Sequence, residues 1–412
     1  MSSVKGKTRL RFIPYRKKDV VEMCMTEGGF SEEQQIQFRE FCRLLQSVYH
    51  FEFHQRLERL KDAYAPLNPD RDTIRLNAAP IQDEVEFVDL LESLLNRANY
   101  EKLSDDELKT AMEEASLFQL RIHVDFDQFS ELLVFTRGEK TKTEVVSKLY
   151  GIIKSEQVFT NFDRVVVYVK FKPDSSSERP GHKPGTTLLK LFQNVPKADI
   201  EILFPDTRVG MRTIDKLMIG VPAVLGGGAV LTTKVGAALL LLMGVLGFWL
   251  GLSSEPVTID QATLIAIFAG LGAIGSFIWK QFVKFKNRKL TFMQTLTENL
   301  YFKNLDKNAG VFHRLIDDAE EEECKEAMLA YYFLLSREGL NQTSLLDDSI
   351  ENWFRESWGC ELDFEVEDAL AKLVELGLVR RNSDTELADV LEAKPLDQGI
   401  ALMNTRWDQY FN

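Results

Sequence analysis

Cysteine and histidine are scarce in this sequence of 412 residues, which holds four of the first and five of the second. The four cysteines are widely separated, and no two of them have the C-x-x-C spacing of zinc or redox sites: Cys24, Cys42, Cys324 and Cys360. This distribution predicts buried free thiols in a reducing compartment. A phosphate-binding loop, a dinucleotide fingerprint and a nucleophile elbow are also missing, so the sequence offers no signature of a known catalytic class.

Positive charge is in deficit as well. The chain has 50 Lys and Arg against 63 Asp and Glu, which gives a formal net charge of -13. Because neutralisation of phosphates supplies most non-specific affinity for nucleic acid, we expect no nucleic-acid partner. No continuous apolar stretch follows the basic residues of positions 1–11, so we expect no secretory signal peptide.

Charge itself is nearly absent from one long stretch, residues 217–279. Two segments there, 235–252 and 262–279, are apolar over almost the 20 residues that a helix needs to cross a bilayer. The Gly-rich segment 217–233 contains Pro222 and is expected to be an interfacial or re-entrant helix, although three crossings remain an alternative. The sequence therefore predicts a transmembrane helical hairpin within a membrane segment at 213–283.

The charges that flank this segment predict its orientation. Basic residues precede it, and five more follow it, whereas the connection 253–261 carries Glu255 and Asp260 and no basic residue. Positive residues stay on the cytoplasmic side, so we expect a multi-pass membrane protein with both termini in the cytoplasm. The five following residues are expected to contact anionic lipid headgroups: Lys280, Lys284, Lys286, Arg288 and Lys289.

Small residues recur every four positions in the two apolar segments. Gly247 and Gly251 form a G-x-x-x-G pair, and Ala262, Ala266 and Gly270 repeat the spacing. Small residues at this spacing allow helix backbones to approach closely. They predict packing within the hairpin or, alternatively, a homo-oligomer.

The N-terminal domain, residues 1–212, is expected to be α+β. Ser31 and Gln34 form a capping box at the start of a helix whose apolar periodicity runs to Leu60. Two further helices are predicted at 82–97 and 104–115. Shorter strands with alternating apolar residues follow, at 120–124, 132–136, 164–172 and 187–192. Together these patterns predict helices first and a small sheet afterwards.

The C-terminal domain, residues 284–412, has the pattern of a winged helix: helices at 317–336, 344–358 and 366–376, and then a short hairpin. Its acidic residues, including the run 320–323, make DNA binding unfavourable and favour a protein-docking role. On the third helix we expect five apolar residues to face the core: Val366, Ala369, Leu370, Leu373 and Val374. Glu367, Asp368, Lys372 and Glu375 are then expected to point outward, with Glu367 and Asp368 as the partner-binding residues.

Three motifs suggest a relationship. They are Arg11-Phe12-Ile13-Pro14, the segment from Tyr64 to Asp72, and the segment from Lys190 to Pro205 that precedes the apolar stretch. With these motifs the chain resembles the transmembrane protein 143-like family of membrane proteins, which is defined by a domain of unknown function. The resemblance implies a two-span membrane protein. Because the chain lacks the presequence of mitochondrial members, it implies a bacterial member in the inner membrane.

One group of residues has the chemistry of a metal site. His50, His54 and Glu58 lie four residues apart on one face of the long predicted helix. Two imidazoles and a carboxylate suit zinc or iron, but no fourth ligand accompanies them, and a polar helix stripe has the same pattern.

The leading functional hypothesis is therefore a membrane-anchored scaffold or adaptor, without an enzymatic activity, that binds a lipid bilayer and a protein partner. An oligomeric pore or transport accessory protein is one alternative. A metal-dependent enzyme that uses His50, His54 and Glu58 is the other.

Overall fold

The computed structural model describes most of the chain, namely residues 9–70, 83–113, 121–124, 126–148, 153–173, 185–205, 208–210, 243–244, 246–251, 260–382 and 390–410. The chain forms two compact units. The first consists of residues 1–115, 125–204 and 303–412, and the second consists of residues 116–124 and 205–302. The second unit is thus inserted in the sequence of the first.

The first unit begins with two helices, α1 (Lys17–Glu27) and α2 (Glu32–Tyr64). The predicted capping box is present at the start of α2: Ser31 Oγ accepts from the backbone N–H of Gln34, whose side chain accepts from the backbone N–H of Ser31. These two bonds satisfy backbone donors that a helix N-terminus would otherwise leave unpaired. The helix predicted from the sequence is confirmed over its whole length.

Two helices, α3 (Asp83–Arg97) and α4 (Asp105–Glu113), match the two predicted helices, and the first unit also contains a five-stranded antiparallel sheet. Its strand order is β1-β3-β4-β5-β7. The strands are β1 (Glu101–Lys102), β3 (Phe129–Lys148), β4 (Ile153–Phe171), β5 (Thr187–Pro196) and β7 (Asn304–Lys307). Short 3-10 helices, η1 (Phe126–Gln128) and η2 (Lys197–Leu203), lie next to β3 and β5 in the sequence.

The C-terminal part of the first unit has the predicted order of three helices and a hairpin. The helices are α8 (Ala309–Ser336), α9 (Thr343–Trp358) and α10 (Val366–Glu375). The hairpin pairs β8 (Val379–Asn382) with β9 (Val390–Ala393). A further helix, α11 (Leu396–Gln409), follows the hairpin and was not predicted.

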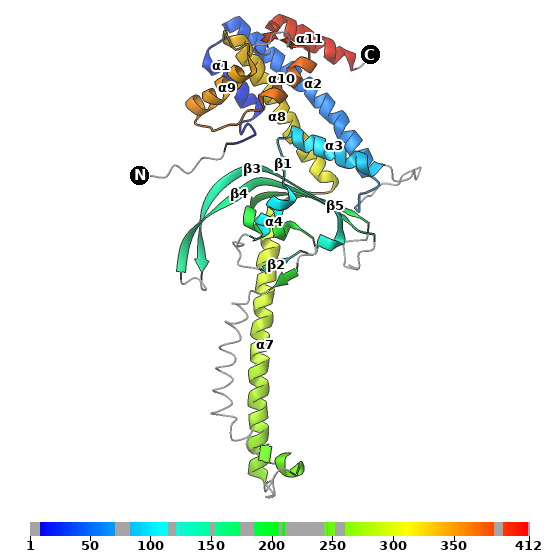
Figure 1. Cartoon of the computed structure of the whole chain (residues 1–412), viewed down its shortest axis with the longest axis vertical. Coiled ribbons are helices and arrows are strands. Elements are labelled where there is room, and N and C mark those ends of the chain that lie inside the picture. The colour runs from blue at the N-terminus through cyan, green and yellow to red at the C-terminus, as the bar shows by residue number, and fades with distance from the viewer. Residues whose placement is uncertain are drawn as a thin grey trace. The chain divides into compact units, whose positions relative to one another are not determined.

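The N-terminal and C-terminal helices share one hydrophobic core, so the predicted boundaries 1–212 and 284–412 do not separate independent domains. Helix α2 packs against α8 and α11 (Figure 1). The ring of Phe41 lies 4.7 Å from that of Tyr331, and the ring of Tyr64 lies 5.1 Å from that of Phe312. Helix α8 is buried from Val311 to Phe333 on most of its surface, as expected of a helix surrounded by other elements.

The second unit contains a two-stranded antiparallel sheet of β2 (Arg121–His123) and β6 (Arg208–Gly210), and the long helix α7 (Gln261–Lys303). Helix α7 has 43 residues and, at 1.5 Å per residue, is roughly 65 Å long. It includes the predicted span 262–279 and continues without a break through the basic residues that follow (Figure 1).

The structure corrects the prediction of a transmembrane hairpin. Within the ranges that it describes, no helix is long and apolar enough to cross a membrane. The sequence prediction treated the apolar run 262–279 as a separate segment, whereas it forms part of a longer helix whose second half is rich in lysine. The finding contradicts the multi-pass localisation and the transmembrane part of the predicted fold class. Segment 217–233, and residues 235–242, 245 and 252 of the other predicted span, lie outside the described residues.

Candidate functional site

The most unusual feature of the first unit is a row of buried carboxylates on α8. The side chains of Glu322, Glu323 and Glu326 are at most 2 % exposed. A buried carboxylate is costly unless it is paired and hydrogen-bonded, so each requires a cationic partner. The run 320–323 was expected to disfavour DNA binding by repelling phosphate, but two of its members, Glu322 and Glu323, are buried and cannot face a ligand.

Each of the buried carboxylates is paired with a cation. The carboxylate of Glu323 accepts hydrogen bonds from Nε and Nη2 of Arg97, the last residue of α3. Glu326 accepts from Lys372 of α10 at 2.6 Å and from Asn99 at 2.8 Å.

Glu322 has the largest set of partners. It accepts from Arg137 Nη2 of β3 at 2.7 Å and from Lys325 Nζ at 2.8 Å. A single helix therefore connects α3, α10 and the sheet through ion pairs.

The N-terminal segment closes over this network. The backbone N–H of Ile13 donates to Glu322 at 2.9 Å, and Lys325 donates to the carbonyl oxygen of Ile13 at 2.7 Å. Leu10 forms an isolated parallel bridge with Leu362, and its carbonyl oxygen accepts from the backbone N–H of Asp363 at 2.9 Å. These bonds hold residues 10–13, here called the strap, against the C-terminal helices.

Burial changes the protonation of this network. It raises the pKa of the Glu326 carboxyl to about 7, although Lys372 and Asn99 act in the opposite direction. The pKa of Lys372 is raised, because the carboxylates of Glu326, Glu323 and Asp368 outweigh the effect of its own burial. The pKa of Tyr100 is raised too, mainly by burial and next by the Asp318 carboxylate. Glu326 is thus a carboxyl that titrates near neutral pH inside the core.

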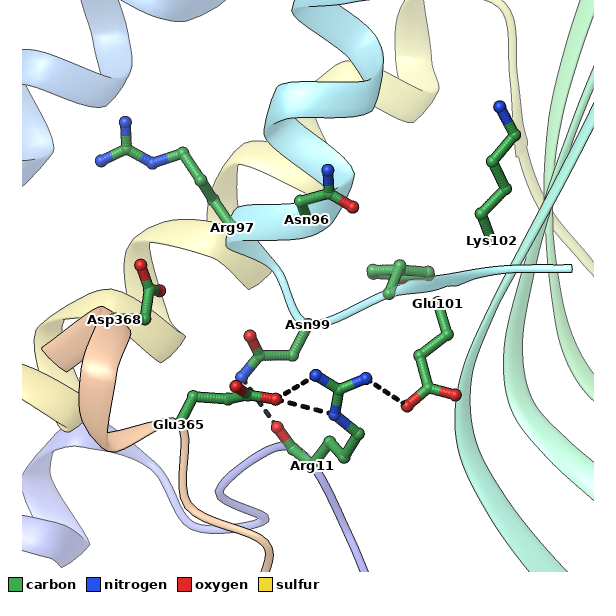
Figure 2. A pocket seen from close by; sticks show the side chains of 9 residues that line it. Arg11, Asn96, Arg97, Asn99, Glu101, Lys102, Glu365 and Asp368 are labelled. Carbon is green, nitrogen blue, oxygen red and sulfur yellow. Dashed lines mark hydrogen bonds and ion pairs between the residues drawn. The ribbon is translucent and has the colours of Figure 1, made fainter. Parts of the chain in front are cut away.

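A first cavity, of about 570 Å³, opens beside the strap and is here called the Arg11 cavity. Figure 2 shows the Arg11 guanidinium between the carboxylates of Glu101 and Glu365, with Arg97 and Asp368 at another part of the wall. Arg11 donates to Glu101 at 2.7 Å and forms two hydrogen bonds with Glu365. The wall is polar. Arg11 is paired within it, whereas Arg97, Lys102 and Asp368 pair with residues outside the lining, namely Glu323, Glu92 and Lys372.

A second cavity, of about 380 Å³, lies under residues 12–16 and is here called the Arg164 cavity. Three residues of its wall form one row across the sheet, because Arg137 of β3 is directly opposite Arg164 of β4, and Arg164 is directly opposite Gln193 of β5. Residues paired in this way point to the same face of the sheet. The ring of Phe12 covers Arg137 at 4.5 Å.

The proposed metal ligands do not converge. His50 Nδ1 lies 3.0 Å from Glu320, and Glu58 accepts from Lys61 at 2.8 Å, a bond that lowers the pKa of Glu58. In the part of the chain that the structure describes, no three His, Cys, Asp or Glu side chains form a group able to hold a metal ion. Zinc or iron binding at His50, His54 and Glu58 stays a prediction that this arrangement does not favour.

The predicted docking surface on α10 is corrected in part. Glu367 pairs with Arg381 at 2.7 Å, and Asp368 pairs with Lys372 at 2.7 Å. Lys372 was expected to point outward but is only 7 % exposed, because it neutralises the buried Glu326. Val374 was expected to face the core but is 42 % exposed, whereas the other four apolar positions are buried as predicted.

The remaining predicted residues lie in the second unit. Lys280, Lys284, Lys286, Arg288 and Lys289 all belong to α7, and so do Ala262, Ala266 and Gly270. A Cβ atom added at Gly247 or Gly251 would meet no described atom within 4 Å, so these two glycines are not in close contact with another described helix. Lipid contact and helix packing by these residues stay predictions.

Comparison with models of protein families gives a match. Residues 162–310 match the model of a domain family described as protein of unknown function (DUF3754). The matched region begins in β4 and ends at the start of α8. It therefore contains Arg164, Gln193 and the whole predicted motif from Lys190 to Pro205. No solved structure matches the chain.

Sequence reasoning missed the residues that neutralise the α8 carboxylates. Arg97, Arg137 and Lys372 come from three distant segments, and nothing in their local sequence distinguishes them from surface cations. One signal was present: the run 320–323 lies within a helix whose other residues are almost all apolar or aromatic from Ala327 to Leu335. A helix that is apolar on every side is a buried helix, so charges within it need partners.

Proposed function

We propose that this chain is a scaffold or adaptor that binds another protein chain along the outer half of the β3–β4 hairpin. One observation carries the proposal. Glu139–Lys148 pairs with Ile153–Phe162 strand to strand, whereas β1 joins β3 only at 135–136 and β5 joins β4 only at 161–170. Among the described residues, no third strand pairs with the outer part of either strand.

This outer part, residues 139–148 and 153–160, is here called the arm. Figure 1 shows β3 and β4 curving away from the other strands as a two-stranded ribbon. A hairpin of two strands alone is marginally stable in water, and its edges carry backbone donors and acceptors that can accept a further strand. Strand addition to such an edge is a common way to bind an extended peptide.

The body of the first unit supports the proposal because it can hold the arm rigidly. The described core residues of β3 and β4 lie at the base of the hairpin, from Phe129 to Arg137 and from Asn161 to Phe171. The α8 ion pairs then connect this base to the N-terminal and C-terminal helices. The finer relationship to the transmembrane protein 143-like family, with a bacterial origin, belongs to the same proposal, since the comparison supports only the domain of unknown function.

The test is photocrosslinking in cells with a benzophenone amino acid placed at exposed positions. Thr141 and Glu156 are exposed on the arm, and Glu33 is an exposed control on α2. We expect one recurring crosslinked partner from Thr141 and Glu156, which mass spectrometry identifies, and none from Glu33.

A shortened chain provides the second half of the test. Thr143 and Val158 are directly paired, so replacing residues 144–157 by Asn-Gly leaves a two-residue hairpin loop. The shortened chain should keep its thermal unfolding midpoint and lose the crosslinks made from Thr141. Undiminished crosslinking of the same partner by the shortened chain would contradict the proposal, as would equal labelling at Glu33.

A further inference from the structure

We propose that the Arg164 cavity binds a small organic monoanion through its carboxylate group. The proposal is independent of the arm, because it depends on the base of the sheet and on α8. It starts from the direct opposition of Arg137 and Arg164 on neighbouring antiparallel strands. Like charges in this position destabilise a sheet, so each guanidinium requires a compensating anion.

Arg137 has its compensation within the protein. Its Nη1 lies 3.2 Å from Asp318, and its Nη2 lies 2.7 Å from Glu322. The side chain is 9 % exposed, and its Nε is buried without a hydrogen-bond acceptor. A buried donor without a partner is costly, so the protein does not satisfy this guanidinium completely.

Arg164 has no such compensation. It is half-buried, and it forms neither an ion pair nor a side-chain hydrogen bond with any residue that the structure describes. Burial raises the pKa of Tyr100, and the positive charge of Arg164 acts in the opposite direction and lowers it by a smaller amount. The row Arg137–Arg164–Gln193 therefore presents one unmatched positive charge beside an amide side chain.

The other charges of the wall, except Glu321, have ion-pair partners. Lys325 pairs with Glu322, and Asp163 accepts from Lys140 at 2.5 Å. Arg16 pairs with Asp19 at 2.9 Å. Glu321 lies among the cations Arg16, Lys17 and Lys325, although burial raises its pKa. After this pairing, Arg164 is the wall cation and Glu321 the wall carboxylate that no described ion pair holds, so Arg164 is the group to which a ligand carboxylate would bind.

A carboxylate fits this arrangement better than a phosphate. A guanidinium and a carboxylate match in charge and can form two parallel hydrogen bonds, whereas the second charge of a dianion would find no further unpaired cation in the described wall. The cavity volume of about 380 Å³ lies at the lower end for small-molecule sites, and Phe12, Ile13 and Pro14 offer apolar contact for the rest of the ligand.

The experiment uses the full chain and titrates it with benzoate by calorimetry. Benzyl alcohol has the same ring without the charge, and inorganic phosphate supplies the alternative anion. We expect saturable binding of one benzoate per chain, and at least tenfold weaker binding of both controls. Arg164→Gln should weaken benzoate binding at least tenfold, whereas Arg43→Gln, at an exposed arginine on α2, should leave it unchanged.

Thermal unfolding of the unliganded variants separates binding from folding. Because Arg164 opposes Arg137, Arg164→Gln removes a repulsion, and its midpoint without ligand should equal or exceed that of the parent chain. Absence of saturable benzoate binding, equal affinity in Arg164→Gln, or tighter binding of phosphate would overturn the proposal. A lower midpoint together with lost binding would instead give Arg164 a structural role and would equally overturn it.

Discussion

The backbone N–H of Ile13 donates to the carboxylate of Glu322 at 2.9 Å, across 309 positions of the sequence. The same carboxylate accepts hydrogen bonds from Arg137 and Lys325, and Lys325 also donates to the carbonyl oxygen of Ile13. One side chain on α8 thus joins the N-terminal strap, the sheet and its own helix. Its loss should affect all three.

We expect Glu322→Gln to lower the free energy of unfolding by about 3–5 kcal/mol, because it leaves the buried Lys325 and Arg137 short of a negative charge. Denaturant titration of the full chain measures the change. Glu321→Gln is the matched control on the next position of α8: its carboxyl is half-buried and its pKa is already raised by burial, so the change should stay below about 1 kcal/mol. Equal losses in the two variants would contradict the role given to Glu322.

The second prediction concerns pH. Burial raises the pKa of Glu326 to about 7 from a usual value of 4.5, so between these values the folded chain holds a proton that the unfolded chain releases. The stabilisation that protonated Glu326 gives the folded chain is fully present below pH 4.5 and is lost as the pH rises through 7. Glu326→Gln should remove this part of the slope, as shown by unfolding free energies measured at intervals from pH 4.5 to 8. An unchanged slope in the variant would show that Glu326 does not titrate in this range.

The third prediction contrasts two ion pairs near α10. The side chain of Lys372 is 7 % exposed and forms ion pairs with Glu326, with Asp368 and, at 3.9 Å, with Glu323. The side chain of Arg381 is 32 % exposed and forms an ion pair with Glu367. Lys372→Met should cost about 3–5 kcal/mol, because buried carboxylates lose their cation. Arg381→Gln should cost less than about 1 kcal/mol, as exposed pairs do. The comparison needs only chemical denaturation of both variants, and a smaller loss for Lys372→Met would refute the assignment.

The fourth prediction uses the thiols. All four cysteines are free, and burial raises the pKa of each thiol. Cys24, Cys42 and Cys324 are buried, whereas Cys360 is partly exposed and can be reached by a reagent. A thiol reagent at neutral pH should modify one cysteine per native chain quickly and all four after denaturation. Cys360→Ser should abolish the fast phase. Two fast thiols in the native parent chain would contradict the buried positions.

Local patterns predicted the helices well. The capping box at Ser31, the apolar periodicity of α2 and the order of α8, α9, α10 and a hairpin depend on nearby residues, and the structure has them. The strands were predicted too short, because β3 and β4 continue as the arm, where polar and charged residues are frequent. Strand pairing there depends on the partner strand rather than on an apolar face.

Long-range pairing could not be predicted. Lys372 was placed outward because a lysine on a short amphipathic helix is normally exposed, and only the position of Glu326 on another helix makes it a buried cation. Arg164 became a candidate ligand-binding residue only when the sheet register placed Arg137 opposite it. For the same reason, the sequence divided between two domains a core that α2, α8 and α11 form together.

That shared core has a consequence for synthesis on the ribosome. The apolar face of α2 is complete in the sequence at Tyr64, but it is covered by residues as late as Met403, which is 0 % exposed. About 340 residues must be translated in between, which takes roughly 20 to 70 s at 5–20 residues per second. During this time the nascent α2 exposes aromatic side chains that other chains can bind, and contacts so distant in sequence form slowly. Production of this protein should therefore depend on chaperones that hold its first 70 residues until α11 has been made.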